Sequence, residues 1–354
     1  MEVRDLKYLL AYTLPLCNLI GLTYLGGWSY LTLIITFGAI PLLEVILPGD
    51  SQNLTAEEFE SKKHNKFFDL MLYGNVVIIY MQVALLIFTL VNVDLSNFEI
   101  LGLILSTGIL LGSNGINVAH ELGHKSSSLA KFASKALLLP SLYMHFIIEH
   151  NRGHHVHIAT PLDPATSRLN EYIYTFWFRS ITGGYLSAWR LEAKRLTKDE
   201  SSVYSYKNEM IRFAFFQVLY LGLVYYFFGL FIMVCLIFVA LISVLLLESI
   251  NYVEHYGLVR RLNPSGRYEP VTNIHSWNSD HEVGRILLYE LTRHSDHHYK
   301  ANKKYQILEH YDDSPQLPFG YPGSILLALF PPLWFAKMNP VVNEWKSSSL
   351  YNSL

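Results

Sequence analysis

The sequence predicts an all-α integral membrane protein with about six transmembrane helices and a cytoplasmic, histidine-rich helical domain. Hydrophobic residues make up 51% of the 354 residues and charged residues only 16%, with a mean hydropathy of +0.24. Several apolar stretches approach the roughly 20 residues that cross a bilayer. Nine of the 15 histidines lie in three short clusters and at one single position. We expect residues 1–354 to form one domain.

Six apolar stretches have the length and composition of transmembrane helices. They are expected at about 8–26, 29–47, 69–92, 98–118, 211–229 and 231–250. The first stretch lacks a small-residue cleavage site, so we interpret it as a retained span rather than a signal peptide. Short joints near Gly26, Ser96 and Gly229 connect the stretches in pairs. The spans are therefore expected to form three helical hairpins.

The basic residues indicate the orientation of these spans. Lysine and arginine are absent from residues 8–61, 67–124 and 213–259. Because cytoplasmic loops of membrane proteins carry the excess of lysine and arginine, the basic segments are predicted to be cytoplasmic. This places both termini and the regions 119–210 and 251–354 on the cytoplasmic side.

The clustered histidines are spaced like metal ligands. They are His120 and His124; His150, His154 and His155; the single His255; and His294, His297 and His298. Residues three and four apart share a helix face, so each cluster can present its imidazoles in one direction. Neutral imidazole is the commonest metal ligand, and one ion takes about four to six ligands. Nine histidines therefore predict two metal ions at one membrane boundary, but the spacing leaves open how the ions divide them.

Other residues narrow the chemistry. Cys17 and Cys235 are the only cysteines, which excludes a cysteine-held iron–sulfur cluster within this chain. No Gly-x-Gly-x-x-Gly dinucleotide fingerprint is present, so redox chemistry would need a separate electron donor. Imidazole suits zinc, copper and iron alike. A site at the bilayer favours iron and O2 chemistry on a lipid-soluble substrate.

The segment from His120 to His124 also matches the His-Glu-x-x-His pattern of zinc proteases. In that alternative Glu121 would be the general base of an intramembrane metallopeptidase. The alternative leaves seven histidines without a role. The six histidines outside the clusters are expected to be ordinary loop or core residues; they are His64, His145, His157, His275, His281 and His310.

The histidine motifs resemble those of the integral-membrane non-haem di-iron monooxygenases and desaturases, and most closely those of the alkane 1-monooxygenase family. Three segments carry the resemblance: residues 149–155 (EHNRGHH), 251–258 (NYVEHYGL) and 291–298 (LTRHSDHH). Thr292 stands where the family usually has Gln, at a position that is not a ligand. Xylene monooxygenase hydroxylase subunits have similar motifs, so an alkyl-aromatic monooxygenase or a lipid desaturase remains an alternative.

The resemblance implies that all nine clustered histidines ligate two non-haem iron ions. Ligating histidines usually donate their other ring N–H to a carboxylate or carbonyl. Candidate partners are Glu121, Glu149, Asp163, Glu254 and Asp296. Arg152 and Arg293 lie inside the motifs, where they can pair with these acids.

The resemblance further implies a reaction and partners. The enzyme would hydroxylate the terminal methyl of medium- or long-chain n-alkanes to 1-alkanols in the inner membrane of a bacterial cell. The hydrocarbon would enter from the bilayer, through a narrow tunnel between the first four spans and the sixth. Electrons would come from reduced rubredoxin and its NADH-dependent reductase, and no nucleic acid is involved. Basic residues expected to dock an acidic donor are Arg260, Arg261, Arg267, Arg285, Lys300, Lys303 and Lys304.

Overall fold

A computed structural model of the chain describes residues 3–348, which contain helices and isolated bridges but no β-strand. Five helical segments in this part are long and apolar enough to cross a membrane. They are Val3–Tyr24, Gly26–Ile46, Lys66–Asn92, Asn97–His124 and Glu209–His255. The predicted all-α membrane class is confirmed.

The spanning segments are built from the following elements. The first is η1 (Val3–Tyr12) with α1 (Thr13–Tyr24), and the second is η2 (Gly26–Tyr30), α2 (Leu31–Ile34), η3 (Ile35–Ala39) and α3 (Ile40–Ile46). The third is α5 (Lys66–Asn92), and the fourth is α6 (Asn97–Leu110), η4 (Leu111–Ile116) and α7 (Asn117–His124). The fifth is α12 (Glu209–His255), which contains both of the last two predicted spans.

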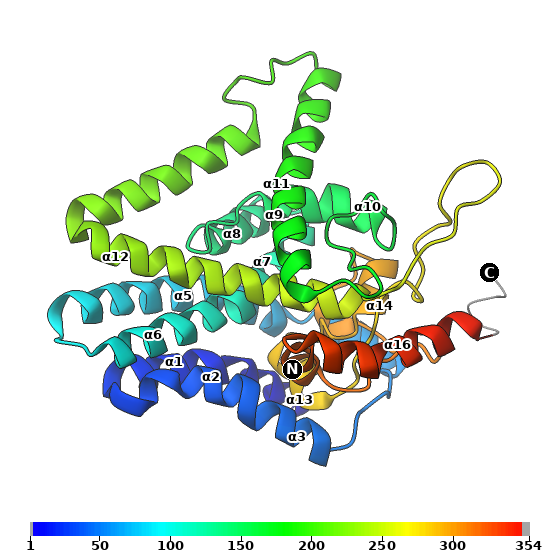
Figure 1. Ribbon diagram of the computed structural model, residues 1–354, viewed down its shortest axis with the longest axis horizontal. Helices are drawn as coiled ribbons and strands as arrows, with labels where there is room; N and C mark the ends of the chain where they lie inside the picture. The colour runs from blue at the N-terminus through cyan, green and yellow to red at the C-terminus, as the bar shows by residue number, and fades with distance from the viewer. Residues whose placement is uncertain (1–2, 349–354) are drawn as a thin grey trace.

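The hairpin within α12 turns at Gly229, where φ is 83° and ψ is 177°. Glycine adopts this backbone conformation without the steric penalty of a side chain. Figure 1 shows the two halves of α12 diverging from this turn, with the second half running back beside α5 and α6. The expected turn between the fifth and sixth predicted spans is therefore present at Gly229, within the segment labelled α12.

Local sequence explains where two of the spans begin. The Asn65 side chain accepts a hydrogen bond from the backbone N–H of Phe67 at the start of α5. Ser96 and Glu99 form a reciprocal capping box at the start of α6. These side chains satisfy backbone N–H groups that the first turn of a helix leaves without partners.

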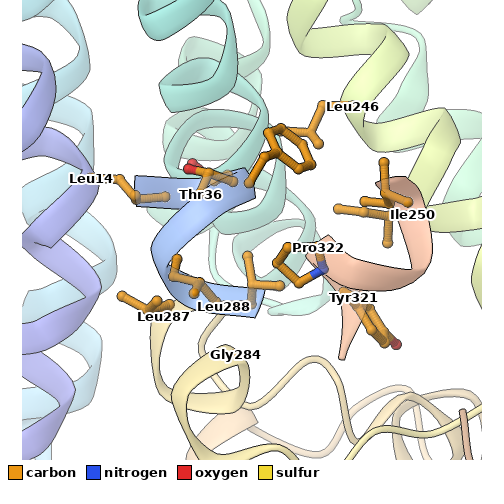
Figure 2. Close-up of a pocket in the computed structure, with 13 residues that line it drawn as sticks. Leu14, Thr36, Leu246, Ile250, Gly284, Leu287, Leu288, Tyr321 and Pro322 are labelled. Carbon is orange, nitrogen blue, oxygen red and sulfur yellow. The ribbon is translucent and has the colours of Figure 1, made fainter. Parts of the chain in front are cut away.

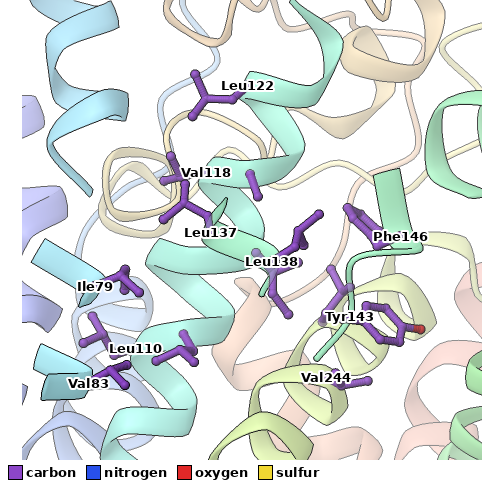
Figure 3. Packing of buried hydrophobic residues seen from close by; sticks show 14 of the residues in the cluster. Ile79, Val83, Leu110, Val118, Leu122, Leu137, Leu138, Tyr143, Phe146 and Val244 are labelled. Atoms are coloured by element: carbon purple, nitrogen blue, oxygen red, sulfur yellow. The ribbon is translucent and has the colours of Figure 1, made fainter. Parts of the chain in front are cut away.

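The hydrophobic core joins α5, α6, α7, α8 (Ser128–Leu138) and α12. Figure 3 shows Val83 and Leu110 on one side of this core, with Leu138 and Val244 on the other. Close approach of α6 to α12 requires small residues. A Cβ atom on Gly108 would lie 2.5 Å from the Cβ atom of Ile242. This fits the preference of membrane helix interfaces for glycine.

The remaining helices are shorter or lie outside the spans. They are α4 (Ala56–Lys63), α9 (Phe146–Glu149), η5 (His150–His154), α10 (His155–His157), α11 (Ile173–Lys198), α13 (Glu282–Leu287), α14 (His294–Tyr299), η6 (Tyr305–Ile307), α15 (Tyr321–Ala328) and α16 (Pro331–Ser347). Figure 1 shows α13, α14 and α16 gathered at one end of the spanning helices, while α11 crosses them steeply. The clustered histidines lie at that end.

Candidate metal centre

The structure brings the nine clustered histidines together in two adjacent groups. The first group is His120, His124, His150, His155 and His297, and the second is His154, His255, His294 and His298. Within each group the candidate ligand atoms all lie within 4.8 Å of one another. Each group can therefore hold one metal ion. The other six histidines belong to neither group.

The second motif divides between the two groups because its backbone is a π-helix. In η5 the N–H of His155 donates to the carbonyl of His150, five residues earlier. This wider turn aligns His150 with His155 and turns His154 away. Our expectation that His150 and His154 point in one direction, which assumed α-helical spacing, is wrong. π-Turns of this kind frequently occur at functional sites.

The last motif also serves both groups. His294 and His298 are one α-helical turn apart on α14, and their Nε2 atoms lie 2.8 Å from each other in the second group. His297, three residues after His294 on α14, belongs to the first group, so the expectation that the last cluster presents its imidazoles to one site is wrong. Segments 150–155 and 294–298 thus connect the two groups, whereas α7 serves the first group and α12 the second.

Burial keeps most of these imidazoles neutral. Burial, together with neighbouring histidines, lowers the pKa of His150, His155 and His297 well below its ordinary value. The same causes lower the pKa of His294 and His298. A neutral imidazole carries a lone pair that can ligate a metal, so these groups are ready to bind a cation at neutral pH.

His154 has a different environment. Burial is the largest single influence and lowers its pKa, but the carboxylates of Asp163, Glu149 and Glu254 together outweigh burial, and the net effect raises the pKa. Nδ1 of His154 lies 2.9 Å from Asp163, which also accepts hydrogen bonds from Thr166 and the N–H of Ala165. Nε2 of His154 is left buried without a partner. Asp163 therefore orients His154 for metal binding, as expected for a carboxylate beside a ligating histidine.

The geometry and donor chemistry fit transition-metal ions. Nε2 of His150 lies 2.9 Å from Nε2 of His155 and 3.2 Å from Nε2 of His124. Nε2 of His120 and both ring nitrogens of His255 are buried without hydrogen-bond partners. Buried polar atoms without partners are costly, and a bound cation would satisfy them. Nitrogen-only sites suit zinc, copper and iron.

The five candidate acids behave differently. Asp163 and Glu254 contact histidines of the second group, at 2.9 Å from His154 and 3.1 Å from His294. Asp163 contacts Nδ1 of His154 and leaves its Nε2 without a partner, as expected of a supporting acid, whereas Glu254 contacts Nε2 of His294, the nitrogen that faces His298. The other three acids contact no clustered histidine at hydrogen-bond distance.

Each of those three acids has another neighbour. Glu121 accepts a hydrogen bond from the N–H of Tyr305 at 3.4 Å. Asp296 accepts from Lys303, and Glu149 packs against Gly153. The Glu121 carboxylate is directed toward Tyr305 rather than toward a histidine group. His120 and His124 also share their group with His150, His155 and His297, which lie outside the His-Glu-x-x-His segment. The metallopeptidase alternative therefore loses its support.

The two arginines of the motifs pair with acids that the sequence did not indicate. Arg152 contacts Glu192 at 2.8 Å, and Arg293 lies 3.9 Å from Glu290 and 4.0 Å from Asp280. The expected pairing with the five candidate acids is wrong: Glu192 and Asp280 come from segments that the fold brings close, and Glu290 precedes Arg293 by three residues.

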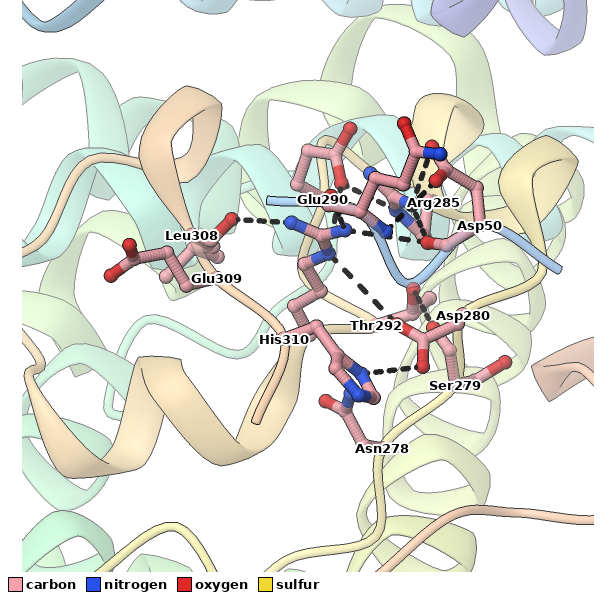
Figure 4. A network of polar contacts seen from close by, with 12 residues as sticks. Asp50, Asn278, Ser279, Asp280, Arg285, Glu290, Thr292, Leu308, Glu309 and His310 are labelled. Atoms are coloured by element: carbon pink, nitrogen blue, oxygen red, sulfur yellow. Dashed lines mark hydrogen bonds and ion pairs between the residues drawn. The ribbon is translucent and has the colours of Figure 1, made fainter. Parts of the chain in front are cut away.

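The network around Arg293 anchors the segment that precedes His294. Arg293 donates to the carbonyl oxygens of Leu308 and Gln52. Figure 4 shows Arg285 beside Glu290, and the two side chains are 2.7 Å apart. Arg285 is buried, so our expectation that it lies on a docking surface is wrong.

An apolar cavity with a volume of about 40 Å³ lies near the second group. Figure 2 shows residues of the first and second spanning segments and of α12 around it, with Tyr321 and Pro322 of α15 at its edge. The buried Tyr321 hydroxyl faces Glu254, which contacts His294. No motif marks Tyr321, and the sequence analysis missed it.

Comparisons with known proteins agree with this arrangement. Residues 98–323 match the fatty acid desaturase family. The alkane 1-monooxygenase 1 of Pseudomonas aeruginosa is 42% identical over 330 residues, covering 90% of this chain and 84% of that protein. The alkane 1-monooxygenase 1 of Alcanivorax borkumensis is 38% identical over 343 residues, covering 96% and 85%. The xylene/toluene monooxygenase hydroxylase component of Pseudomonas putida is 31% identical over 345 residues, covering 96% and 89%. The chain therefore belongs to the alkane 1-monooxygenase family and is a membrane monooxygenase.

Proposed function

We propose that this protein hydroxylates the terminal methyl of medium- or long-chain n-alkanes to 1-alkanols. The observation that carries the proposal is the pair of buried histidine groups at one end of the spans, together with an apolar cavity that Tyr321 links to Glu254 and His294. The reaction consumes one alkane, one O2, two electrons and two protons, and yields one alcohol and one water. Similarity to a xylene/toluene monooxygenase component makes alkyl-aromatic methyl oxidation the second candidate.

The nine clustered histidines are proposed to ligate two iron ions, and residues 1–354 to act as one catalytic domain. Bound iron would supply the activation of O2 that protein side chains cannot perform. The protein's part is to hold the imidazoles neutral and oriented and to exclude bulk water. Seven of the nine histidines are buried, and only His124 and His155 are partly exposed.

The apolar cavity supports a hydrocarbon substrate. Its lining includes Leu14, Ile40 and Ile250, and such side chains select by shape rather than by hydrogen bonding. A volume of about 40 Å³ has room for a chain end rather than a whole chain. Because Tyr321 connects this cavity to Glu254 and His294, the chain end would lie toward the second group. Terminal selectivity follows from that orientation.

A second, polar cleft supports the docking of an electron donor. It has a volume of about 580 Å³ and is lined by His124 together with Lys125, Lys303 and Lys304. His124 lines this cleft and is a member of the first group. Only the His124 side chain would therefore separate a donor in the cleft from a metal ion held by the first group. The lining also contains Asp69 and Glu121, and Lys125 and Lys304 pair with Asp69, so the three lysines exceed the acids by one. This excess of lysine favours an acidic partner. We propose reduced rubredoxin, recharged by its NADH-dependent reductase, as that donor.

The orientation of the protein is part of the proposal. Both histidine groups lie where two spanning segments end, at His124 and His255. The lysines of the cleft lie at the same end, and lysine is enriched on the cytoplasmic side of membrane proteins. We therefore propose a multi-pass protein of the bacterial inner membrane, with both termini and the metal-binding regions in the cytoplasm.

A product assay tests this function. Membranes containing the protein, rubredoxin, its reductase and NADH would receive octane, hexadecane and p-xylene together under isotopically labelled O2. Labelled 1-alkanol is the expected product. Labelled benzylic alcohol alone would favour the alkyl-aromatic alternative, and an alkene without label would favour desaturation. Oxidation of the donor with no labelled product would contradict hydroxylation of these substrates.

A further inference from the structure

The Glu254 carboxylate lies 3.1 Å from Nε2 of His294, a member of the second histidine group. We infer that the Glu254 carboxylate is itself a ligand of the ion held by His154, His255, His294 and His298. The inference rests on the proposed function, because it assumes that this group binds iron. It adds an oxygen donor to a site whose other ligands are all nitrogen.

The contrast with Asp163 shows why Glu254 differs from an orienting acid. Asp163 contacts Nδ1 of His154 and leaves Nε2 of that ring unpaired. Glu254 instead lies 3.1 Å from Nε2 of His294. That same nitrogen faces Nε2 of His298 at 2.8 Å. An orienting carboxylate contacts the nitrogen that does not bind metal, whereas Glu254 contacts the His294 nitrogen that faces another histidine of the same group.

The composition of the two groups supports a carboxylate in the second. The first group has five histidines and the second has four; Glu254 is not among the residues whose ligand atoms all lie within 4.8 Å of one another, and its carboxylate would bring the second group to five by turning further toward it. Iron sites that react with O2 commonly combine imidazole with a carboxylate. In such sites the carboxylate also offsets part of the metal's charge, which four neutral imidazoles do not.

The surroundings of Glu254 fit a ligand better than a conventional ion pair. The side chain is buried, and its ion-pair partner is a histidine rather than a lysine or arginine. Buried charges normally pair with an opposite charge or coordinate a metal. The neighbouring Tyr321 hydroxyl is buried too, and it lines the apolar cavity. A carboxylate ligand at this position would connect the cavity directly to the second ion.

The test compares two buried glutamates that are each adjacent in sequence to a clustered histidine. Glu254 precedes His255 and faces His294, whereas Glu121 follows His120 and faces the backbone of Tyr305. Wild type, Glu254→Gln and Glu121→Gln would be purified intact and loaded with Mössbauer-active iron. Iron per chain and the spectrum of the reduced protein would be measured without substrate.

We expect the wild type and Glu121→Gln to bind iron in two spectroscopically distinct sites, in line with the two groups. In Glu254→Gln one site should be lost or shifted and the other unchanged. Iron content and a spectrum identical to wild type would overturn the inference. A wild type that binds no iron would instead contradict the proposed function. If Glu254→Gln does not fold, Glu254→Asp answers the same question, because shortening a ligand must shift one site, and an unshifted spectrum overturns the inference.

Discussion

The contact between α6 and α12 provides a strong test of how the histidine groups are held. Gly108 of α6 faces Ile242 of α12, and an added Cβ would lie 2.5 Å from Ile242 Cβ, 2.6 Å from its Cγ2 and 3.1 Å from the carbonyl oxygen of Val239. Carbon atoms in favourable contact are roughly 3.5–4.0 Å apart. Gly108→Ala therefore creates an overlap of about 1 Å between two packed helices.

The size of the effect follows from two opposing terms. Overpacking a tight interface typically costs about 1–3 kcal/mol. Replacing a helical glycine by alanine recovers roughly 0.5–1 kcal/mol of helix propensity. We expect Gly108→Ala to lower the free energy of unfolding by about 1–2 kcal/mol. Gly222→Ala is the matched control, since a Cβ on Gly222 meets no atom within 4 Å.

The helices displaced by this substitution lead to different histidine groups. α6 continues through η4 into α7 with His120 and His124, and α12 ends at His255. We therefore expect Gly108→Ala to weaken metal retention as well as stability. The assay is thermal unfolding in detergent with metal analysis of each purified variant. Equal stability and metal content in Gly108→Ala and Gly222→Ala would refute the reasoning.

Three further predictions concern the site and its support. Asp163→Asn should weaken metal binding about 10–100-fold, because His154 loses the carboxylate that orients it; a competition assay with a chelator would detect this, and unchanged affinity would contradict it. Burial raises the pKa of Glu290, but neighbouring arginines outweigh it and hold the pKa below its ordinary value. Its stabilising contribution is therefore complete above about pH 4.3 and lost as pH falls through the lower folded pKa. Glu290→Gln breaks the buried pair with Arg285 and should destabilise the protein by about 3–5 kcal/mol at neutral pH in denaturation experiments. Glu282→Gln breaks the partly exposed pair with Lys7 and should change stability by only about 0–1 kcal/mol. Ile40→Trp should fill the apolar cavity and shift the product profile toward shorter 1-alkanols. Leu42→Trp, at an exposed position on the same helix, should leave the profile unaltered.

The sequence by itself determined the membrane class and the identity of the clustered histidines. Transmembrane helices depend on local composition and length, so the spans could be located without knowing their neighbours. The hairpin turn at Gly229 was also visible locally, because a glycine separates two apolar runs. The motifs then predicted a two-metal centre, and the nine histidines do gather in two compact groups.

Only the tertiary structure decided how those histidines divide and what supports them. The separation of His150 from His154 depends on a π-turn, whose hydrogen bonds differ from the α-helical pattern that spacing alone suggests. The sequence does not distinguish Glu254 from Asp163, yet Glu254 contacts Nε2 of His294 and Asp163 contacts Nδ1 of His154. Arg293 pairs with acids outside the histidine motifs. Contacts such as His294 with Glu254 and Arg293 with Asp280 join different segments of the chain, so they depend on how the helices pack and cannot be inferred from local sequence.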